Sequence, residues 1–248
     1  MNGHPLLEAR ELTVRFGGLT AVDAVSAAFA SGELAGIIGP NGAGKTTFFN
    51  ALSGVVQPTS GELFAAGQRL TGAAPHRFAQ RGVARTFQTP RVFAELSVAH
   101  NVGFGLQFAG RRRSASWLLK DANSILNLIG LAAQALLPAA ALTSSQQRLL
   151  EIGMALATKP RLLLLDEVAA GLTENELQAM AQLIRRLRDE LDLTVIWIEH
   201  AVTTLLQHVD RVIVLHQGRK IADGTPAEVV RNAEVIEAYL GDEMAEAA

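Results

Sequence analysis

Residues 34–47 read Leu34-Ala35-Gly36-Ile37-Ile38-Gly39-Pro40-Asn41-Gly42-Ala43-Gly44-Lys45-Thr46-Thr47, an apolar run followed at once by a glycine-rich turn. The apolar run predicts a buried strand, and residues 47–52 after the turn predict a helix. In such a unit the backbone N–H groups of the turn point inward and form a nest for phosphate oxygens. Lys45 adds a positive charge for the β- and γ-phosphates, and the Thr46 hydroxyl can bind Mg²⁺. The segment therefore predicts a phosphate-binding loop over 39–47.

The bulk composition restricts the class of protein. The chain has 248 residues, of which 49% are hydrophobic, enough for one α/β domain with a subdomain. A net charge of −2 does not resemble the basic surface of a nucleic-acid-binding protein, and the one dense positive run, 111–113, is typical of a solvated loop. Cysteine is absent, which excludes disulfides and thiol chemistry. No apolar run approaches the roughly 18 residues of a membrane span, and residues 1–10 do not predict export.

The order of expected elements predicts the fold class. Strands at 6–16 and 22–29 form an antiparallel opening, and further strands are expected at 62–66, 82–87, 161–166, 194–198, 209–216 and 219–222. Short helices are expected at 75–80, 227–231 and 234–240, a long one at 174–191, and a frayed tail at 243–248. Residues 97–158 have a helical pattern throughout. We therefore expect an α/β fold with a mostly parallel sheet, a core over 6–88 and 159–241, and an inserted helical subdomain over 89–158.

An acidic pair complements the phosphate-binding loop. Asp166 ends the apolar run 162–166, and an aspartate at the carboxyl end of a neighbouring buried strand can hold Mg²⁺ directly or through water. Glu167 then remains free to polarise a water molecule in line with the γ-phosphate. The sequence therefore predicts phosphoryl transfer to water by positioning rather than by covalent catalysis.

Three further side chains are candidates for the same site. His200 ends the strand 195–200 at the edge of a parallel sheet where ligands gather, so it can contact a γ-phosphate. Gln88 follows the strand 82–87 and precedes the helical region, so its amide can contact Mg²⁺ or the attacking water. Phe16 precedes two glycines and can stack on adenine. Considered alone, each of these side chains would more often have a structural role. Their occurrence together with Lys45 and Asp166 favours a functional role.

Taken in order, these motifs resemble those of ABC-transporter ATPase subunits over nearly the whole chain. The segments 15–22, 85–88, 169–172 and 235–241 are similar to the ATP-binding subunits of branched-chain amino acid importers, with urea or short-amide importers as a close sister group. The resemblance implies a single ATPase domain that binds ATP and Mg²⁺. It also implies a head-to-tail pair of ATPase subunits at the cytoplasmic face of the inner membrane, beneath two permeases that an extracytoplasmic binding protein supplies.

The resemblance also implies roles for individual residues. Lys45 and Thr46 would hold phosphates and Mg²⁺, Asp166 and Gln88 the metal, and Glu167 the water. His200 would contact the γ-phosphate and Phe16 the adenine. The nucleotide-binding set is Phe16, Gly39, Pro40, Asn41, Gly42, Ala43, Gly44, Lys45, Thr46 and Thr47, joined in trans by Thr143, Ser144, Ser145 and Gln146 from the partner's signature segment, 142–148.

That signature segment departs from the family pattern. The chain has Leu142-Thr143-Ser144-Ser145-Gln146 where the family has Leu-Ser-Gly-Gly-Gln. The segment directs a helix N-terminus at the γ-phosphate of the partner's ATP, and a capping box from Thr143 to Gln146, or from Ser144 to Gln147, can still form. Ser145 adds a Cβ where close backbone approach is needed. We therefore expect an asymmetric pair, a heterodimer in which this chain's own ATP is the hydrolysable one.

Other functions remain as alternatives to an importer ATPase. A urea or short-amide importer shares the same motifs. A nucleotide-gated module with weak hydrolysis would fit the irregular signature, although an intact Glu167 argues against it. Soluble ABC proteins of translation or DNA repair carry tandem cassettes or long coiled-coil insertions, for which this chain has no room. A GTPase is excluded because the sequence has no Asn-Lys-x-Asp segment that reads guanine.

Overall fold

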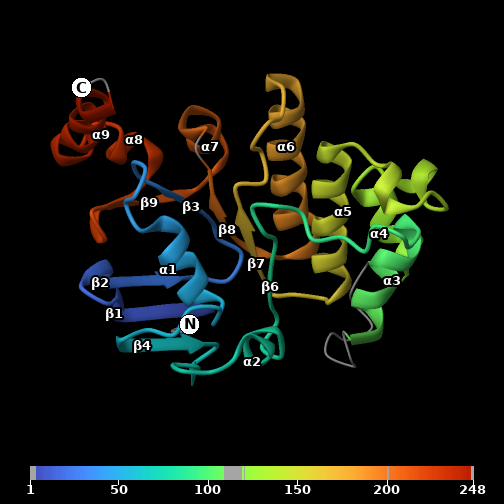
Figure 1. Ribbon diagram of the computed structural model, residues 1–248, viewed down its shortest axis with the longest axis horizontal. Helices are drawn as coiled ribbons and strands as arrows, with labels where there is room; N and C mark the ends of the chain where they lie inside the picture. Colours follow the sequence, from blue (N-terminus) through green and yellow to red (C-terminus); the bar gives the residue numbers. More distant parts are fainter. Residues whose placement is uncertain (1–3, 109–118, 120, 200, 247–248) are drawn as a thin grey trace.

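A computed structural model describes residues 4–108, 119, 121–199 and 201–246, and two β-sheets organise the chain (Figure 1). The first is a four-stranded antiparallel sheet in the order β2-β1-β4-β5. Its strands are β1 (Leu7–Phe16), β2 (Leu19–Phe29), β4 (Ser60–Ala65) and β5 (Gln68–Arg69). Several shifts of register between β1 and β2 twist this sheet, which lies at the lower left of Figure 1.

The second sheet has six strands in the order β10-β9-β3-β8-β7-β6. The strands are β3 (Leu34–Ile38), β6 (Val83–Arg85), β7 (Leu162–Asp166), β8 (Thr194–Ile198), β9 (Arg211–His216) and β10 (Arg219–Gly224). Every neighbouring pair is parallel except β10 with β9. The expected mostly parallel sheet with a separate antiparallel sheet is therefore confirmed.

Both faces of the six-stranded sheet are buried, in two separate hydrophobic clusters. In β7, Leu163 and Leu165 pack into the cluster on the side of the helices, whereas Leu162 and Leu164 pack into the cluster shared with the antiparallel sheet. The same alternation holds in β3 and β8, because successive side chains of a strand point to opposite faces. Strands buried on both faces are continuously apolar, which explains the uninterrupted run 162–165.

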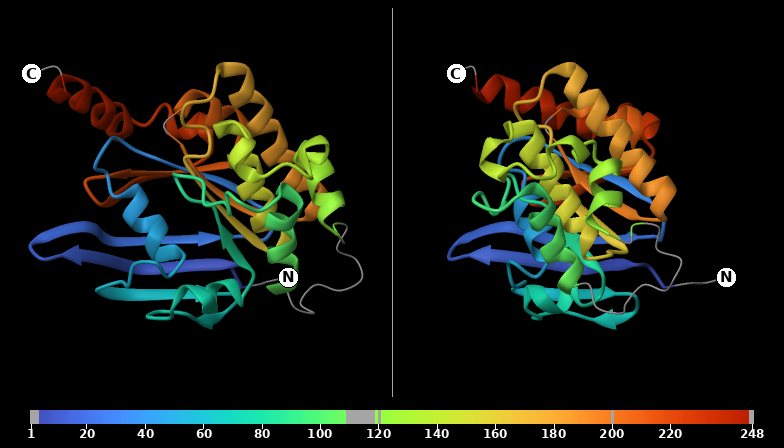
Figure 2. Two further views of the ribbon diagram at one scale, coloured as in Figure 1. Left: turned by 45° about the vertical axis from the view of Figure 1, so that its right-hand side comes forward. Right: turned by 90° about the vertical axis from the view of Figure 1, so that its right-hand side faces the viewer.

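The helices divide between these two sides of the sheet. They are α1 (Lys45–Leu52), α2 (Pro75–Ala79), α3 (Val98–Phe108), α4 (Ala122–Leu128), α5 (Ser144–Ala157), α6 (Glu174–Leu191), α7 (Val202–His208), α8 (Pro226–Val229) and α9 (Ala233–Glu246), with 3₁₀ turns at Ala132–Gln134 and Ala139–Ala141. Helix α1 lies between the two sheets, while α3, α4 and α5 pack together on the far side from the antiparallel sheet (Figure 2). Within the described residues, no helix is long and apolar enough to span a membrane.

The structure corrects several expected boundaries. Helix α7 was not expected, β6 ends at Arg85 rather than at 87, and α9 continues to Glu246 where a frayed tail was expected. The region 97–158 is not helical throughout, because turns and extended residues separate α4 from α5. The basic run 111–113 and His200 lie outside the described residues.

Candidate functional site

The phosphate-binding loop lies between β3 and α1, and two of its glycines are required by the geometry. Gly44, at the N-cap of α1, has φ +95°, and a Cβ there would lie 2.2 Å from the carbonyl oxygen of Ala21. A Cβ on Gly39 would lie 2.0 Å from the carbonyl oxygen of Leu215. Because no larger side chain fits at either position, the loop turns tightly and its backbone lines a cavity of about 600 Å³.

Lys45 is buried in the wall of this cavity. Its Nζ donates hydrogen bonds to the carbonyl oxygens of Gly39 and Pro40, at 2.6 and 2.8 Å. Burial lowers the pKa of Lys45, and the negative charge of Glu167 opposes that shift. The loop therefore fixes a cation at its centre, with the charge of Glu167 acting on it.

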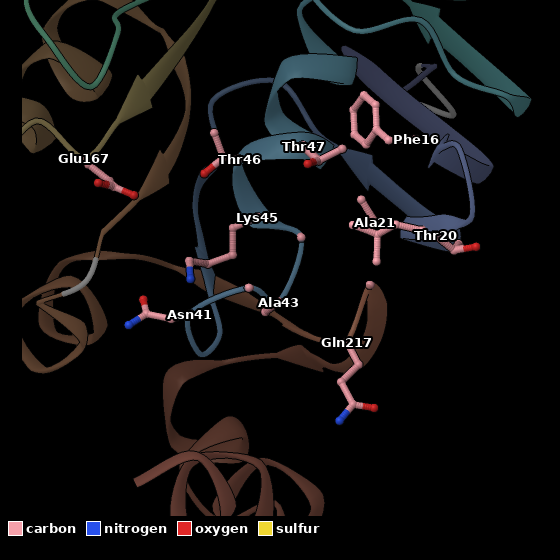
Figure 3. Close-up of a pocket in the computed structure, with 14 residues that line it drawn as sticks. Phe16, Thr20, Ala21, Asn41, Ala43, Lys45, Thr46, Thr47, Glu167 and Gln217 are labelled. Atoms are coloured by element: carbon pink, nitrogen blue, oxygen red, sulfur yellow. The ribbon is translucent and has the colours of Figure 1, made fainter. Parts of the chain in front are cut away.

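The two ends of the cavity differ in chemistry (Figure 3). Phe16, with 52% of its surface exposed, lies at one end, and the carboxylate of Glu167 lies at the other. Lys45 and Thr46 lie between them. The aromatic ring of Phe16 matches a base, and the cation Lys45 with the loop amides matches a triphosphate that extends from it toward Glu167. Thr20, Ala21 and Gln217 also line the cavity and were not expected from the sequence.

Asp166 meets the requirements of a metal ligand. Its side chain is buried, and one oxygen, Oδ2, accepts a hydrogen bond from Arg85 Nη2 at 3.1 Å. The other oxygen, Oδ1, is buried with no hydrogen-bond partner among the described residues. Burial raises the pKa of Asp166, whereas the charge of Arg85 lowers it. A buried carboxylate oxygen without a partner fits a hard cation such as Mg²⁺, with the Thr46 hydroxyl as a second oxygen ligand.

Gln88 and Glu167, 79 residues apart in sequence, are in direct contact. Gln88 Nε2 donates to Glu167 Oε2 at 2.6 Å, and the Glu167 side chain is only 5% exposed. Glu167 has φ +49°, in the left-handed region that a side chain disfavours. An unfavourable backbone conformation at a buried carboxylate that faces a cavity is typical of a functional position.

Two arginines that sequence reasoning missed hold these groups in place. In addition to its bond to Asp166, Arg85 donates hydrogen bonds from Nη1 to Asn50 Oδ1 and Ser53 Oγ, at 2.9 and 2.8 Å. Arg148, on α5, donates to the carbonyl oxygens of Gln88, Glu167 and Ala170. An arginine in a strand or helix carries no sequence signal for such contacts, because the contacts depend on tertiary packing alone.

The signature segment begins helix α5. Thr143 is its N-cap, and the reciprocal bonds between Thr143 and Gln146 form the first of the two capping boxes considered above. The Thr143 hydroxyl also lies 3.0 Å from that of Ser145. Hydrogen bonds from Thr173 lower the pKa of Glu176 on α6, and the Ser145 side chain adds to that shift. Thr143 and Ser145 are thus engaged within this chain, while Ser144 is exposed.

Comparisons with known proteins agree with this arrangement. A family model described as ABC transporter matches residues 22–170, and one described as branched-chain amino acid ATP-binding cassette transporter matches residues 219–245. The chain is 40% identical to the high-affinity branched-chain amino acid transport ATP-binding protein BraF of Pseudomonas aeruginosa, over 96% of this chain and 98% of that protein. It is 39% identical to LivG of Escherichia coli, which carries the same description, with the same coverage.

Solved structures have the same fold. The ADP conformation of MJ1267, an ATP-binding cassette of an ABC transporter, superimposes with a TM-score of 0.81 at 27% identity and covers 95% of this chain and 98% of that one. CbiO1 from Clostridium perfringens, part of the ABC transporter complex cbiONQ, gives a TM-score of 0.81 at 27% identity and covers 94% of both chains.

Proposed function

Because this chain belongs to the ABC transporter family, we propose that it is the ATP-hydrolysing subunit of a membrane importer for branched-chain amino acids. The observation that carries the solute class is the family match over 219–245, together with relatives such as BraF that align along almost the entire chain. A urea or short-amide importer is not favoured by these relatives. A nucleotide-gated module without hydrolysis is not favoured either, because Glu167 is present and faces the nucleotide cavity.

The residues of the cavity support a mechanism for hydrolysis. Phe16 stacks on the adenine, while the loop amides and Lys45 bind the phosphates. A Mg²⁺ ion bound by Thr46, Asp166 and Gln88 would neutralise charge on the β- and γ-phosphates. Glu167 orients the attacking water and accepts its proton, while Gln88 Nε2 holds the carboxylate through Oε2. The γ-phosphate contact of His200 is proposed from the resemblance alone, because His200 lies outside the described residues.

We further propose that this chain works in a pair with a different ATPase subunit. In a head-to-tail pair, Thr143, Ser144, Ser145 and Gln146 face the partner's ATP. The Ser145 side chain reduces the space in which the backbone can approach the γ-phosphate, and the Thr143 hydroxyl already caps its own helix. The partner's site is therefore expected to hydrolyse slowly, whereas the site in this chain remains competent if the partner supplies a regular signature.

The permease contact is proposed for the loop after β6. This segment, Thr86 to Glu95, borders a second cavity of about 390 Å³, which we call the side groove; its lining includes Pro75, Phe78, Phe87, Arg91, Glu151 and Met154. Nearby, the half-exposed ring of Phe93 lies 5.1 Å from that of Phe104. An apolar groove beside exposed aromatic rings fits a short segment of a permease at the cytoplasmic face of the membrane.

Co-purification from membranes tests the proposal. The tagged chain should be isolated with a second ATPase subunit and two permeases, and the reconstituted complex should hydrolyse ATP faster when the extracytoplasmic binding protein carries leucine, isoleucine or valine. Stimulation by urea or short amides instead would overturn the solute class. Recovery of the tagged chain from its native membranes with no permease attached would overturn the importer function as a whole.

A further inference from the structure

A buried carboxylate beside the side groove has no role in the mechanism above. Glu151, on α5, has only 5% of its surface exposed. Its Oε1 accepts a hydrogen bond from the Arg91 backbone N–H at 3.0 Å, and its Oε2 accepts one from the Phe87 N–H at 3.3 Å. These two N–H groups stand on either side of residues 88–90. A single carboxylate therefore holds both ends of the short loop that carries Gln88.

The same loop reaches the hydrolytic carboxylate. The Gln88 side chain donates to Glu167, as described above, and the Gln88 carbonyl accepts a bond from Arg148 Nη1 at 3.3 Å. Arg148 lies three residues before Glu151, so both side chains project from neighbouring positions on α5. Helix α5 thus fixes the loop by two side chains, one of which also binds the carbonyl of Glu167.

The cost of burying this carboxylate argues that its contacts matter. Burial raises the pKa of Glu151, and the two loop amides, together with the charges of Arg148 and Arg91, oppose that shift. An apolar residue would avoid the burial cost but would leave two N–H groups without an acceptor. Because Glu151 also lines the side groove, it lies between the surface proposed for the permease and the residue that acts on water.

We propose that Glu151 is a positioning residue that fixes the Gln88 loop, so that displacement of the loop at the side groove is transmitted to Glu167. The transmission of movement from a permease to Glu167 rests on the proposed function, whereas the hydrogen bonds of Glu151 to the loop do not. Glu151 itself does not touch nucleotide in this scheme.

The grip is tested on the isolated chain. In Glu151→Gln the amide oxygen can accept only one of the two bonds, and its NH₂ group faces the other N–H. Hydrogen exchange of peptides covering 84–92 should then accelerate about tenfold or more, since one bond to a charged acceptor is lost. Met154→Leu is the control, because Met154 lines the same groove and is replaced at similar volume. Unchanged exchange in Glu151→Gln would overturn the proposal.

The transmission is tested in the assembled transporter. Glu151→Gln should leave the KM for ATP within about twofold of wild type and reduce the stimulation of ATP hydrolysis by loaded binding protein at least threefold, because a loosened loop no longer moves Gln88 with the groove. Met154→Leu should keep full stimulation. Faster exchange with unchanged stimulation would overturn the transmission. If the wild-type complex itself shows no stimulation, the proposed function fails, and the exchange result still decides whether Glu151 grips the loop.

Discussion

The ammonium group of Lys45 lies between two carbonyl oxygens of its own loop, in the wall of the nucleotide cavity. Lys45→Ala removes this charge and its hydrogen bonds to phosphate. We expect MgATP to bind at least tenfold more weakly, since a charge-assisted hydrogen bond contributes about 1.5–3 kcal/mol. Isothermal titration calorimetry measures the change. Equal heats for the variant and wild type would exclude this loop as the phosphate site.

A second buried carboxylate gives a pH-dependent prediction. Glu199 Oε1 accepts bonds from the Ala169 N–H and from Trp197 Nε1, at 2.7 and 3.0 Å. Burial raises the pKa of Glu199 above its ordinary value of 4.5, so the native protein retains a proton that the unfolded chain releases. Stability contributed by this group is therefore lost as the pH rises from 4.5 through the native pKa.

Glu199→Gln removes that dependence, because an amide does not ionise and its oxygen can still accept both bonds. We expect the free energy of unfolding of the variant, relative to that of wild type, to increase as the pH rises above 4.5. Urea unfolding at several pH values, followed by tryptophan fluorescence, measures the difference. A constant difference between variant and wild type across the pH range would contradict the assignment.

At the scale of elements, the sequence predicts well what depends on local pattern. The strand and glycine turn before α1 and the capped helix α6 could be predicted because periodicity and capping residues are local signals. Helix α7 could not be predicted, because it has no side-chain cap. Its Leu205 packs closely on Gly36, which has no side chain, and this contact is tertiary. That Lys45 and Glu167 meet at one cavity could be predicted from motif order, whereas the contacts of Arg85 and Glu151 depend on tertiary packing.

The capping box at the start of α5 can contribute both to the stability of the helix and to hydrolysis of the partner's ATP, and one substitution with a control distinguishes the two roles. Thr143→Ala removes the N-cap acceptor and should destabilise the protein by about 1 kcal/mol in chemical unfolding. Thr225→Ala is a matched control, because Thr225 and Glu228 form the same motif at the start of α8. Both variants should lose similar stability. If the start of α5 serves the partner's ATP, only Thr143→Ala should also slow hydrolysis at the partner's site, measured in an assembled pair that carries Glu167→Gln in this chain so that its own site is silent. Equal rates would limit Thr143 to a structural role.

At the scale of the whole molecule, the proposed pair predicts when a dimer forms. Glu167→Gln keeps a side chain of the same shape but cannot accept the proton of water, so bound ATP is not consumed. We expect light scattering to detect an ATP-dependent dimer only when the partner ATPase subunit is present. A stable dimer of the variant chain alone would show instead that two copies of this chain can form a complete pair.

The permease contact is tested on an exposed ring. Phe93→Asp should abolish solute-dependent transport while ATP binding is retained, because Phe93 is 50% exposed and lies outside the nucleotide cavity. Leu136→Asp is the control, since Leu136 is 90% exposed and does not line the side groove. Vesicle uptake and nucleotide titration measure the two effects. Loss of nucleotide affinity in Phe93→Asp would place the contact elsewhere.

The pairing of Arg85 with Asp166 has a consequence for the resting protein. Burial raises the pKa of Asp166, and the guanidinium group 3.1 Å away offsets part of that effect, so the carboxylate has a counter-charge inside the fold without a divalent ion. Chelators should consequently leave the melting temperature of the nucleotide-free chain unchanged. The protein therefore remains folded around this site in the interval between release of one nucleotide and binding of the next.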